Sequence, residues 1–262
     1  MSNKNSWENK SSARERLKEE REKQAKREKV RRQLIAVGSV VAALGIAAGV
    51  AVAVTHSGGS KSLTVPASAT GAQGTTVIYG NPNAKHTLHL YEDPRCPICA
   101  VFEQQDGQAV LAGANEGKYK IQYTFGTFLD GNLGGTGSMN ALNAIGAALN
   151  VSPDAFIKFH TAIYSAKNHP DERTDKFSDN SYLLHIATEV PALKNNTAFQ
   201  NAVKNGTYSG WARKMSDSFN SSGVQGTPTA QLDGKQLNVV TNTGLMPAAQ
   251  LMQSIDQQIG AK

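Results

Sequence analysis

The spacing of hydrophobic and polar positions predicts a folded part that begins near Thr76. The runs 76–80 and 86–94 are strand-like, and apolar and polar residues alternate at 118–125, where a period of two predicts a β-strand. Apolar residues in the run 98–115 recur at helical spacing, with a kink or break expected at Gly107. Helical patterns then follow one another, and we expect helices at 138–150, 153–166, 180–190, 197–205 and 208–222.

Strand patterns return near the C-terminus. The run 227–240 predicts a hairpin around Asp233 and Gly234, a strong turn dipeptide, and 246–260 predicts an amphipathic helix entered through Pro247. Strands split by helices indicate an α/β fold with a central mixed sheet covered on both faces. The helical block at about 130–222 is predicted to be one insertion into that framework, and the glycine-rich stretch 130–138 a loop leading into it.

Residues 34–54 form a run of twenty-one residues without a charge. As a helix this run would measure about 32 Å, which matches a hydrocarbon core of roughly 30 Å. A cleaved secretory signal is the alternative, but its apolar region is usually shorter and follows a shorter basic start. The run therefore predicts a single transmembrane helix, with the lipid bilayer as its partner.

The charges around this run predict its orientation. Arg31 and Arg32 adjoin its N-terminal end, whereas only His56 and Lys61 lie near the other end. The positive-inside rule then places a basic tail, 1–33, in the cytoplasm and the rest outside. The stretch 55–75 is rich in Gly, Ser, Ala and Thr and is predicted to be a flexible linker. The expected location is the cell membrane, with the domain 76–262 extracytoplasmic.

The net charge of +6 belongs to the tail alone. Residues 1–33 contain twelve Lys and Arg against six Glu, while the remainder has fifteen residues of each sign. The folded part thus shows no basic excess, and this argues against nucleic acid as a partner.

Cys96 and Cys99 are the only cysteines of the 262 residues. A structural zinc site uses four ligands, and the chain has no second cysteine pair. His86 and His89 lie on a predicted strand at a spacing that points them to opposite faces, and the other histidines of the folded part show no ligand spacing. A disulfide that closes so short a loop would stabilise the fold weakly. We expect no metal site, and redox chemistry remains as the use of the pair.

The position of the pair favours that chemistry. Cys96 is expected at the end of the loop that leaves the strand at 86–91, with Pro97 as the first helical residue. Free N–H groups and the positive end of the helix dipole would then favour the Cys96 thiolate. Cys99 would lie one turn further on, shielded from solvent and within reach of Cys96. This arrangement predicts a thiol–disulfide exchange pair.

Thr227 and Pro228 form a second feature. Pro228 stands at the start of a strand that should be central, where proline is normally absent. A cis bond between the two residues is expected, with an ordinary trans proline as the alternative.

The acidic residues near the cysteines are expected to be exposed to solvent. Glu92 and Asp93, at the end of the predicted strand, are expected to be solvated, with tuning of the thiols or proton transfer as the alternative. Glu103, one turn past Cys99, is expected on an exposed helix face.

The motif "CPIC" after a strand, "GTP" before a late strand and the helical block between them resemble the DsbA-like branch of the thioredoxin superfamily, over about 76–262. The resemblance implies a thioredoxin fold with an inserted helical domain and no bound cofactor. It implies that Cys96 is the nucleophile and that Cys99 resolves the mixed disulfide. Residues that would support the active site or hold substrate backbone are Pro97, Ile98, Thr227 and Pro228.

One position departs from that family. Ile98 stands between the cysteines, where many relatives carry a histidine whose donor favours the thiolate. The resemblance therefore implies a milder oxidant. The expected function is a membrane-anchored extracytoplasmic thiol–disulfide oxidoreductase, which acts on cysteine-containing extracytoplasmic polypeptides and is recycled by a membrane redox partner. The alternative is a non-enzymatic tethered binding module, or a metal carrier that uses the cysteine pair.

Overall fold

The structure is a computed structural model that describes residues 63–71, 73–241 and 244–260. The predicted basic tail, 1–33, and the predicted transmembrane helix, 34–54, lie outside these residues. Within the described part of the chain, no helix combines the length and the apolar character needed to cross a bilayer.

A mixed five-stranded sheet forms the centre, in the order β1–β3–β2–β4–β5. β2 runs parallel to β3, and the remaining neighbours are antiparallel. Alternate side chains of β2 and β3, such as Leu88, Leu90 and Ile121, are fully buried, as the period of two predicts. The strands are β1 Val77–Tyr79, β2 Thr87–Glu92, β3 Lys120–Phe125, β4 Thr229–Leu232 and β5 Lys235–Leu237.

Two helices connect β2 to β3 in the crossover that parallel strands require. α2 spans Pro97–Gln105 and α3 spans Gly107–Asn115, so the helical run breaks next to Gly107 as predicted. After β5 come two short strands, β6 Val240–Thr241 and β7 Gly244–Leu245, and then α11 Ala248–Ile259. The hairpin between β4 and β5 turns at Asp233 and Gly234, which both have positive φ.

The insertion between β3 and β4 is helical throughout, and each predicted helix is present. Its elements are α4 Phe128–Leu133, α5 Gly137–Val151, α6 Pro153–Tyr164, the 3-10 turns η1 Glu172–Thr174 and η2 Lys176–Ser178, α7 Asn180–Ala187, α8 Pro191–Lys194, α9 Thr197–Asn205 and α10 Ser209–Ser221. Ser152 caps α6 with its hydroxyl, and Asn196 caps α9 with its side-chain carbonyl.

The prediction of a loop over 130–138 was wrong for its first half. α4 occupies Phe128–Leu133, and α5 begins at Gly137, one residue before the predicted start at 138. Phe128 stacks on Phe219 of α10, with ring centroids 5.8 Å apart. This contact joins segments that are distant in sequence, so the local glycine content could not reveal the helix.

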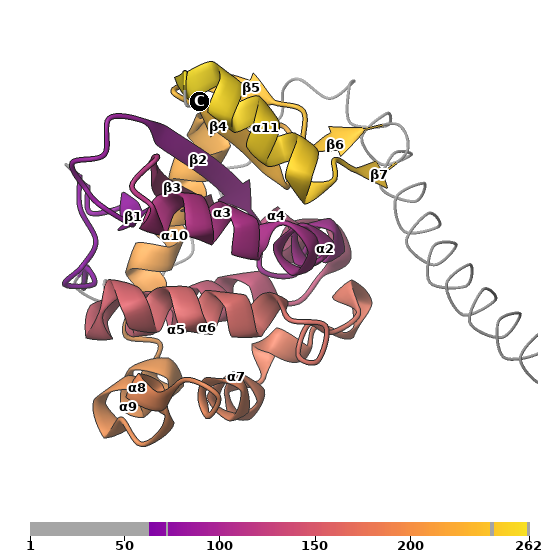
Figure 1. Cartoon of the computed structure of the whole chain (residues 1–262). Coiled ribbons are helices and arrows are strands. Elements are labelled where there is room, and N and C mark those ends of the chain that lie inside the picture. The colour runs from indigo at the N-terminus through magenta and orange to yellow at the C-terminus, as the bar shows by residue number, and fades with distance from the viewer. Residues whose placement is uncertain (1–62, 72, 242–243, 261–262) are drawn as a thin grey trace, which may run out of the picture. The chain divides into compact units, whose positions relative to one another are not determined.

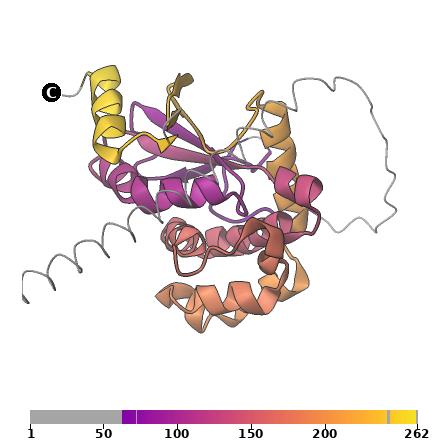
Figure 2. The ribbon, with the colours of Figure 1, turned by 90° about the vertical axis from the view of Figure 1, so that its right-hand side faces the viewer.

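The helices cover both faces of the sheet, as predicted. In Figure 1 the helices α5 to α9 of the insertion lie below the sheet, and α3 and α11 lie in front of it. Figure 2 shows α10 on the opposite side of the sheet from α11. α10 contacts β3, and α6 of the insertion contacts α2, the helix that carries the cysteines. The insertion therefore reaches the cysteine motif directly.

The described part of the predicted linker is in contact with the folded part. The indole N–H of Trp211 donates to the carbonyl of Gly74 at 2.7 Å, and the amide of Ala67 donates to Oδ1 of Asn150 at 3.0 Å. Packing therefore begins before Thr76.

Candidate active site

Cys96 lies where the sequence places it, at the N-terminus of α2. It is the N-cap residue, Pro97 is the first residue of the helix, and the Cys96 Sγ accepts the backbone N–H of Cys99 at 3.4 Å. The Cys96 side chain retains slight exposure at 6%, whereas Cys99 is fully buried. Both are free thiols in this structure. One sulfur is thus open to an incoming group and the other is shielded by it.

Thr227 and Pro228 lie beside the cysteines. The peptide bond between them is cis, so this prediction is confirmed. The Cys96 thiol donates to the carbonyl oxygen of Thr227 at 3.5 Å. Two segments that are 131 residues apart therefore meet at the nucleophile. Ile98 is 2% exposed and Pro228 is buried, so both side chains belong to the packing beneath the active-site surface.

The environment of Cys99 disfavours its thiolate. Burial raises the pKa of Cys99 well above the ordinary value, and the neighbouring Cys96 and the charge of Glu92 raise it further. The side chain of Thr227 opposes this shift. A thiol with so high a pKa is protonated at neutral pH. Cys99 must therefore lose a proton when it attacks a disulfide, and it must take up a proton when it leaves one.

Glu92, Glu103 and His160 form a buried cluster, in which Glu92 is near enough to Cys99 for its charge to affect the pKa of that thiol. Their burial corrects the expectations for both acids. Nε2 of His160 bonds to Oε2 of Glu92 at 2.7 Å, and Nδ1 of His160 lies 3.9 Å from Oε2 of Glu103. Glu92 is completely buried and Glu103 is 9% exposed. Glu103 is not on a solvent face, because α2 turns this side toward α6 of the insertion.

The pKa values of the cluster follow from its burial. Burial raises the pKa of Glu92 to about 8, and burial together with the charge of Glu92 raises the pKa of Glu103 well above its ordinary value. Burial lowers the pKa of His160. At neutral pH the cluster therefore holds protons on carboxyl groups, beside a neutral imidazole.

The same three residues are the donor set that a divalent metal could use, since their ligand atoms lie within 4.8 Å of one another. Two ligands on one tetrahedral zinc are about 3.3 Å apart, from metal–ligand distances of about 2.0 Å. The 2.7 Å between His160 and Glu92 is instead a hydrogen-bond distance. The geometry of the cluster thus fits a shared proton better than a shared cation.

Asp93 also differs from the prediction, because it is completely buried rather than solvated. Its carboxylate accepts the hydroxyl of Ser138 at 2.6 Å, the N–H of Leu129 at 3.1 Å and the N–H of Arg95 at 3.0 Å. Burial raises the pKa of Asp93 to about 7, although the bonds from these donors oppose the shift. The insertion covers this end of β2 and removes both acids from water.

Sequence reasoning missed His160 and Tyr164 as parts of the site. Both are fully buried, and the hydroxyl of Tyr164 has no hydrogen-bond partner among the described residues. Phe156, His160 and Tyr164 recur at intervals of four along α6, and this spacing assigns them to one helix face. The sequence therefore shows that the three residues share a helix face. It does not show that this face packs against the end of β2.

A cysteine pair at a helix start, next to a cis-proline that leads into a central strand, invites comparison with known proteins. A thioredoxin family model matches residues 72–253. The chain belongs to the thioredoxin family. Searching curated proteins yielded no match.

Solved structures place the chain in the DsbA-like branch of that family. A disulfide bond oxidoreductase, DsbG of Mycobacterium tuberculosis in its reduced form, is 26% identical with a TM-score of 0.57, and the match covers 71% of this chain and 87% of that one. Oxidised DsbA of the same organism is 24% identical with a TM-score of 0.58, over 71% and 93%. MdbA of Actinomyces oris, a thiol-disulfide oxidoreductase, is 20% identical with a TM-score of 0.56, over 70% and 85%.

The DsbA-like fold with its helical insertion is thus confirmed, and the enzyme class is protein thiol–disulfide oxidoreductase.

Proposed function

We propose that this DsbA-like protein is a membrane-tethered, extracytoplasmic thiol oxidase that introduces disulfides into cysteine-containing polypeptides. The observation that carries the proposal is the asymmetry of the pair: Cys96 caps α2 and is accessible, while Cys99 is completely buried behind it. A client sulfur can reach only Cys96, so the mixed disulfide forms there.

The exchange then follows a fixed order. A client thiolate attacks Sγ of Cys96, the Cys96–Cys99 bond breaks, and Cys99 leaves as a thiolate that takes up a proton. A second client thiolate attacks the client sulfur of the mixed disulfide, and Cys96 leaves as a thiolate at the N-terminus of α2. The client loses two electrons and the cysteine pair gains them. A membrane redox partner that accepts these electrons would restore the disulfide.

The buried cluster can supply the proton that Cys99 needs. Glu92 is protonated at neutral pH because burial raises its pKa to about 8. It lies near enough to Cys99 that its ionised form raises the pKa of that thiol. Transfer of the proton leaves a carboxylate that Nε2–H of His160 stabilises across 2.7 Å. Glu92 thus acts as the acid when Cys99 departs, and as the base when Cys99 attacks.

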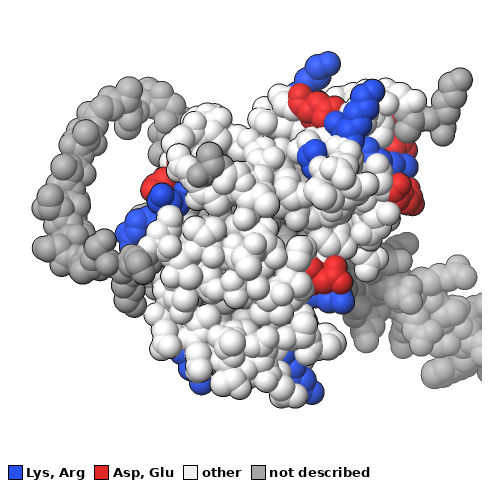
Figure 3. Space-filling model, turned by 90° about the vertical axis from the view of Figure 1, so that its left-hand side faces the viewer, with Lys and Arg blue, Asp and Glu red and all other residues white. Residues whose placement is uncertain are grey.

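The molecular surface suits clients of varied sequence. On the face shown in Figure 3, Lys and Arg lie with Asp and Glu in a few mixed groups, mostly toward the edges, and most of the surface is uncharged. A surface without a dominant charge exerts little electrostatic selection on its partners. The proposed tether rests on the uncharged run 34–54 and on Arg31 and Arg32 before it.

Trapping experiments test the proposal. Oxidised wild-type protein is expected to form disulfides in a reduced, unfolded polypeptide, and Cys96→Ser is expected to abolish this activity. Reduced Cys99→Ser should accumulate a mixed disulfide with an oxidised client, because nothing remains to resolve it. Identical behaviour of the two variants, with no trapped client, would contradict the assignment of roles. Stoichiometric zinc binding by the reduced pair, without exchange, would support the metal-carrier alternative instead.

A further inference from the structure

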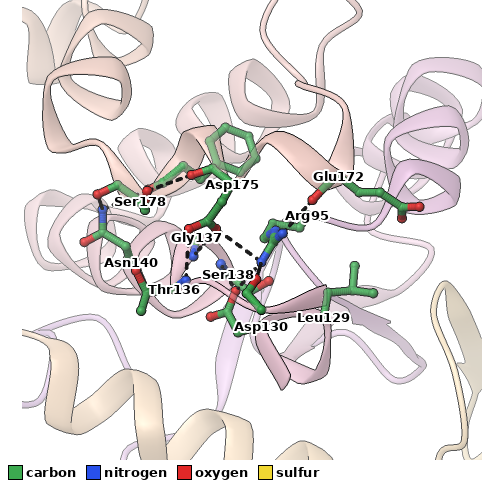
Figure 4. A network of polar contacts seen from close by, with 12 residues as sticks. Arg95, Leu129, Asp130, Thr136, Gly137, Ser138, Asn140, Glu172, Asp175 and Ser178 are labelled. Atoms are coloured by element: carbon green, nitrogen blue, oxygen red, sulfur yellow. Dashed lines mark hydrogen bonds and ion pairs between the residues drawn. The ribbon is translucent and has the colours of Figure 1, made fainter. Parts of the chain in front are cut away.

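Arg95, the residue directly before the nucleophile, extends its side chain into the insertion, as Figure 4 shows. The side chain is only 2% exposed. Its Nη1 donates to Oδ1 of Asp130 at 2.8 Å and lies 3.2 Å from Oδ1 of Asp175. The guanidinium also donates to the backbone carbonyls of Gly134 and Glu172. Every one of these partners belongs to the insertion. We call Arg95, Asp130 and Asp175 the Arg95 joint.

The backbone of the glycine-rich stretch 130–138 surrounds the Arg95 joint. Asp175 accepts the N–H of Thr136 at 3.1 Å and the N–H of Gly137 at 2.8 Å. A Cβ on Gly135 would lie 2.3 Å from the Asp175 carboxylate carbon, and Gly135 has a φ of +96°. A Cβ on Gly137 would lie 3.1 Å from Cδ of Arg95. The glycines thus allow the backbone to close around a buried ion pair.

The joint is connected to the nucleophile through the loop at 93–95. The N–H of Arg95 donates to the Asp93 carboxylate at 3.0 Å, and the N–H of Cys96 donates to the Asp93 carbonyl at 2.9 Å. Nε2 of His169, also in the insertion, bonds to the carbonyl of Pro94 at 3.1 Å. All three residues before Cys96 are therefore held by the insertion.

We propose that Arg95 is a positioning residue for Cys96, and that the Arg95 joint makes the reactivity of Cys96 depend on the insertion. The proposal rests on the proposed function in one respect, that Cys96 is the nucleophile. With the joint intact, the loop holds the Cys96 sulfur where it accepts the N–H of Cys99 in the first turn of α2. With the joint broken, the loop at 93–95 gains freedom, and Cys96 loses the geometry in which its sulfur faces that N–H and the N-terminal end of the helix dipole.

Alkylation of the reduced protein by iodoacetamide at pH 7 tests this directly, because Cys99 is buried and the rate reports Cys96. The variants are Arg95→Gln, Arg95→Lys and Asp175→Asn. Each is expected to slow alkylation by roughly three- to tenfold, because each disrupts the same geometry. Arg95→Lys keeps the charge but cannot reproduce the forked contacts of the guanidinium.

The pattern of the three variants separates positioning from charge. If charge alone mattered, Arg95→Lys would react like the wild type, and Asp175→Asn would change the rate in the opposite direction from Arg95→Gln. Either result would overturn the proposal. Val203→Ala is the control for general destabilisation, since Val203 is buried in α9 of the insertion. It should lower Tm without slowing alkylation, and equal slowing by this variant would also overturn the proposal.

Client oxidation by the wild type is measured in parallel. A wild type that oxidises no client would contradict the proposed function, whereas unchanged alkylation rates in all three variants would contradict the Arg95 joint. The two failures are therefore distinguishable.

Discussion

Replacing Glu92 with glutamine tests whether a protonated carboxyl is buried beneath Cys99. Burial raises the pKa of Glu92 to about 8 from an ordinary value of 4.5. Between these two values the folded state holds a proton that the unfolded state has lost, so the free energy of unfolding falls as pH rises through this window. One pKa unit corresponds to about 1.4 kcal/mol, so raising the pH from 5 to 7 costs about 2.5 kcal/mol through Glu92.

Glu103 and His160 also affect how the free energy of unfolding of the wild type depends on pH. The pKa of Glu103 is also raised, which adds a loss of stability in the same direction. Burial lowers the pKa of His160, so below pH 6.5 the unfolded chain binds a proton that the folded state does not, and stability falls toward acid through this residue. The difference between Glu92→Gln and the wild type removes the contributions that do not depend on Glu92. The part of the Glu103 shift that Glu92 causes is lost in the variant and acts in the same direction as the loss of Glu92 itself. The carbonyl of the glutamine can still accept the bond from Nε2 of His160.

Urea unfolding of the reduced proteins at pH 5, 6 and 7, followed by circular dichroism, measures this difference. The stability of Glu92→Gln relative to the wild type is expected to grow by about 2.5 kcal/mol between pH 5 and pH 7. Glu116→Gln is the matched control, because the Glu116 side chain is 61% exposed, and its curve should parallel the wild type. A Glu92→Gln curve that also runs parallel would refute the buried proton, and with it the role of Glu92 as proton donor to Cys99.

Three further predictions concern other parts of the account. Ile98→His adds a hydrogen-bond donor in the first turn of α2 and should raise the reduction potential of the cysteine pair by tens of millivolts, where about 30 mV equals 1.4 kcal/mol. An unchanged potential after equilibration with glutathione would show that residue 98 does not control it. Phe156→Ala should lower the free energy of unfolding by about 3–5 kcal/mol, since Phe156 is fully buried against Tyr123 and Phe125, and a loss below 1 kcal/mol in urea unfolding would contradict that packing. Protease added outside intact spheroplasts should remove 76–262 and leave the tail at 1–33 protected, whereas mature protein free in the medium would contradict the anchor.

The sequence predicted those elements that local signals define. A strand-like run marked β2, and alternation marked β3. Pro97 marked the start of α2, and Asp233 with Gly234 marked the hairpin turn, since each signal acts within a few residues. α4 was missed because it depends on the contact between Phe128 and Phe219, which only the folded chain provides.

The candidate site divides in the same way. Cys96 at the N-cap and the cis bond before Pro228 follow from motifs and were predicted. The burial of Glu92 could not be predicted, because it depends on His160, which is 68 residues away in the sequence and is brought to the end of β2 by the insertion. Acids at a strand end are ordinarily solvated. Here the helices of the insertion cover the strand end, and the resulting burial raises the pKa of both Glu92 and Asp93. The basic tail and the transmembrane helix stay predictions.

The reduction potential of the Cys96–Cys99 pair tests the central claim most directly, because it decides whether clients are oxidised or reduced. The full chain is equilibrated with defined ratios of reduced and oxidised glutathione, and the thiols are quantified by alkylation and mass. The account predicts a single two-electron couple between about −270 mV, the value for thioredoxin, and about −120 mV, the value for a strongly oxidising DsbA. A potential at or below about −270 mV would make the pair a reductant and would contradict the proposed oxidase function.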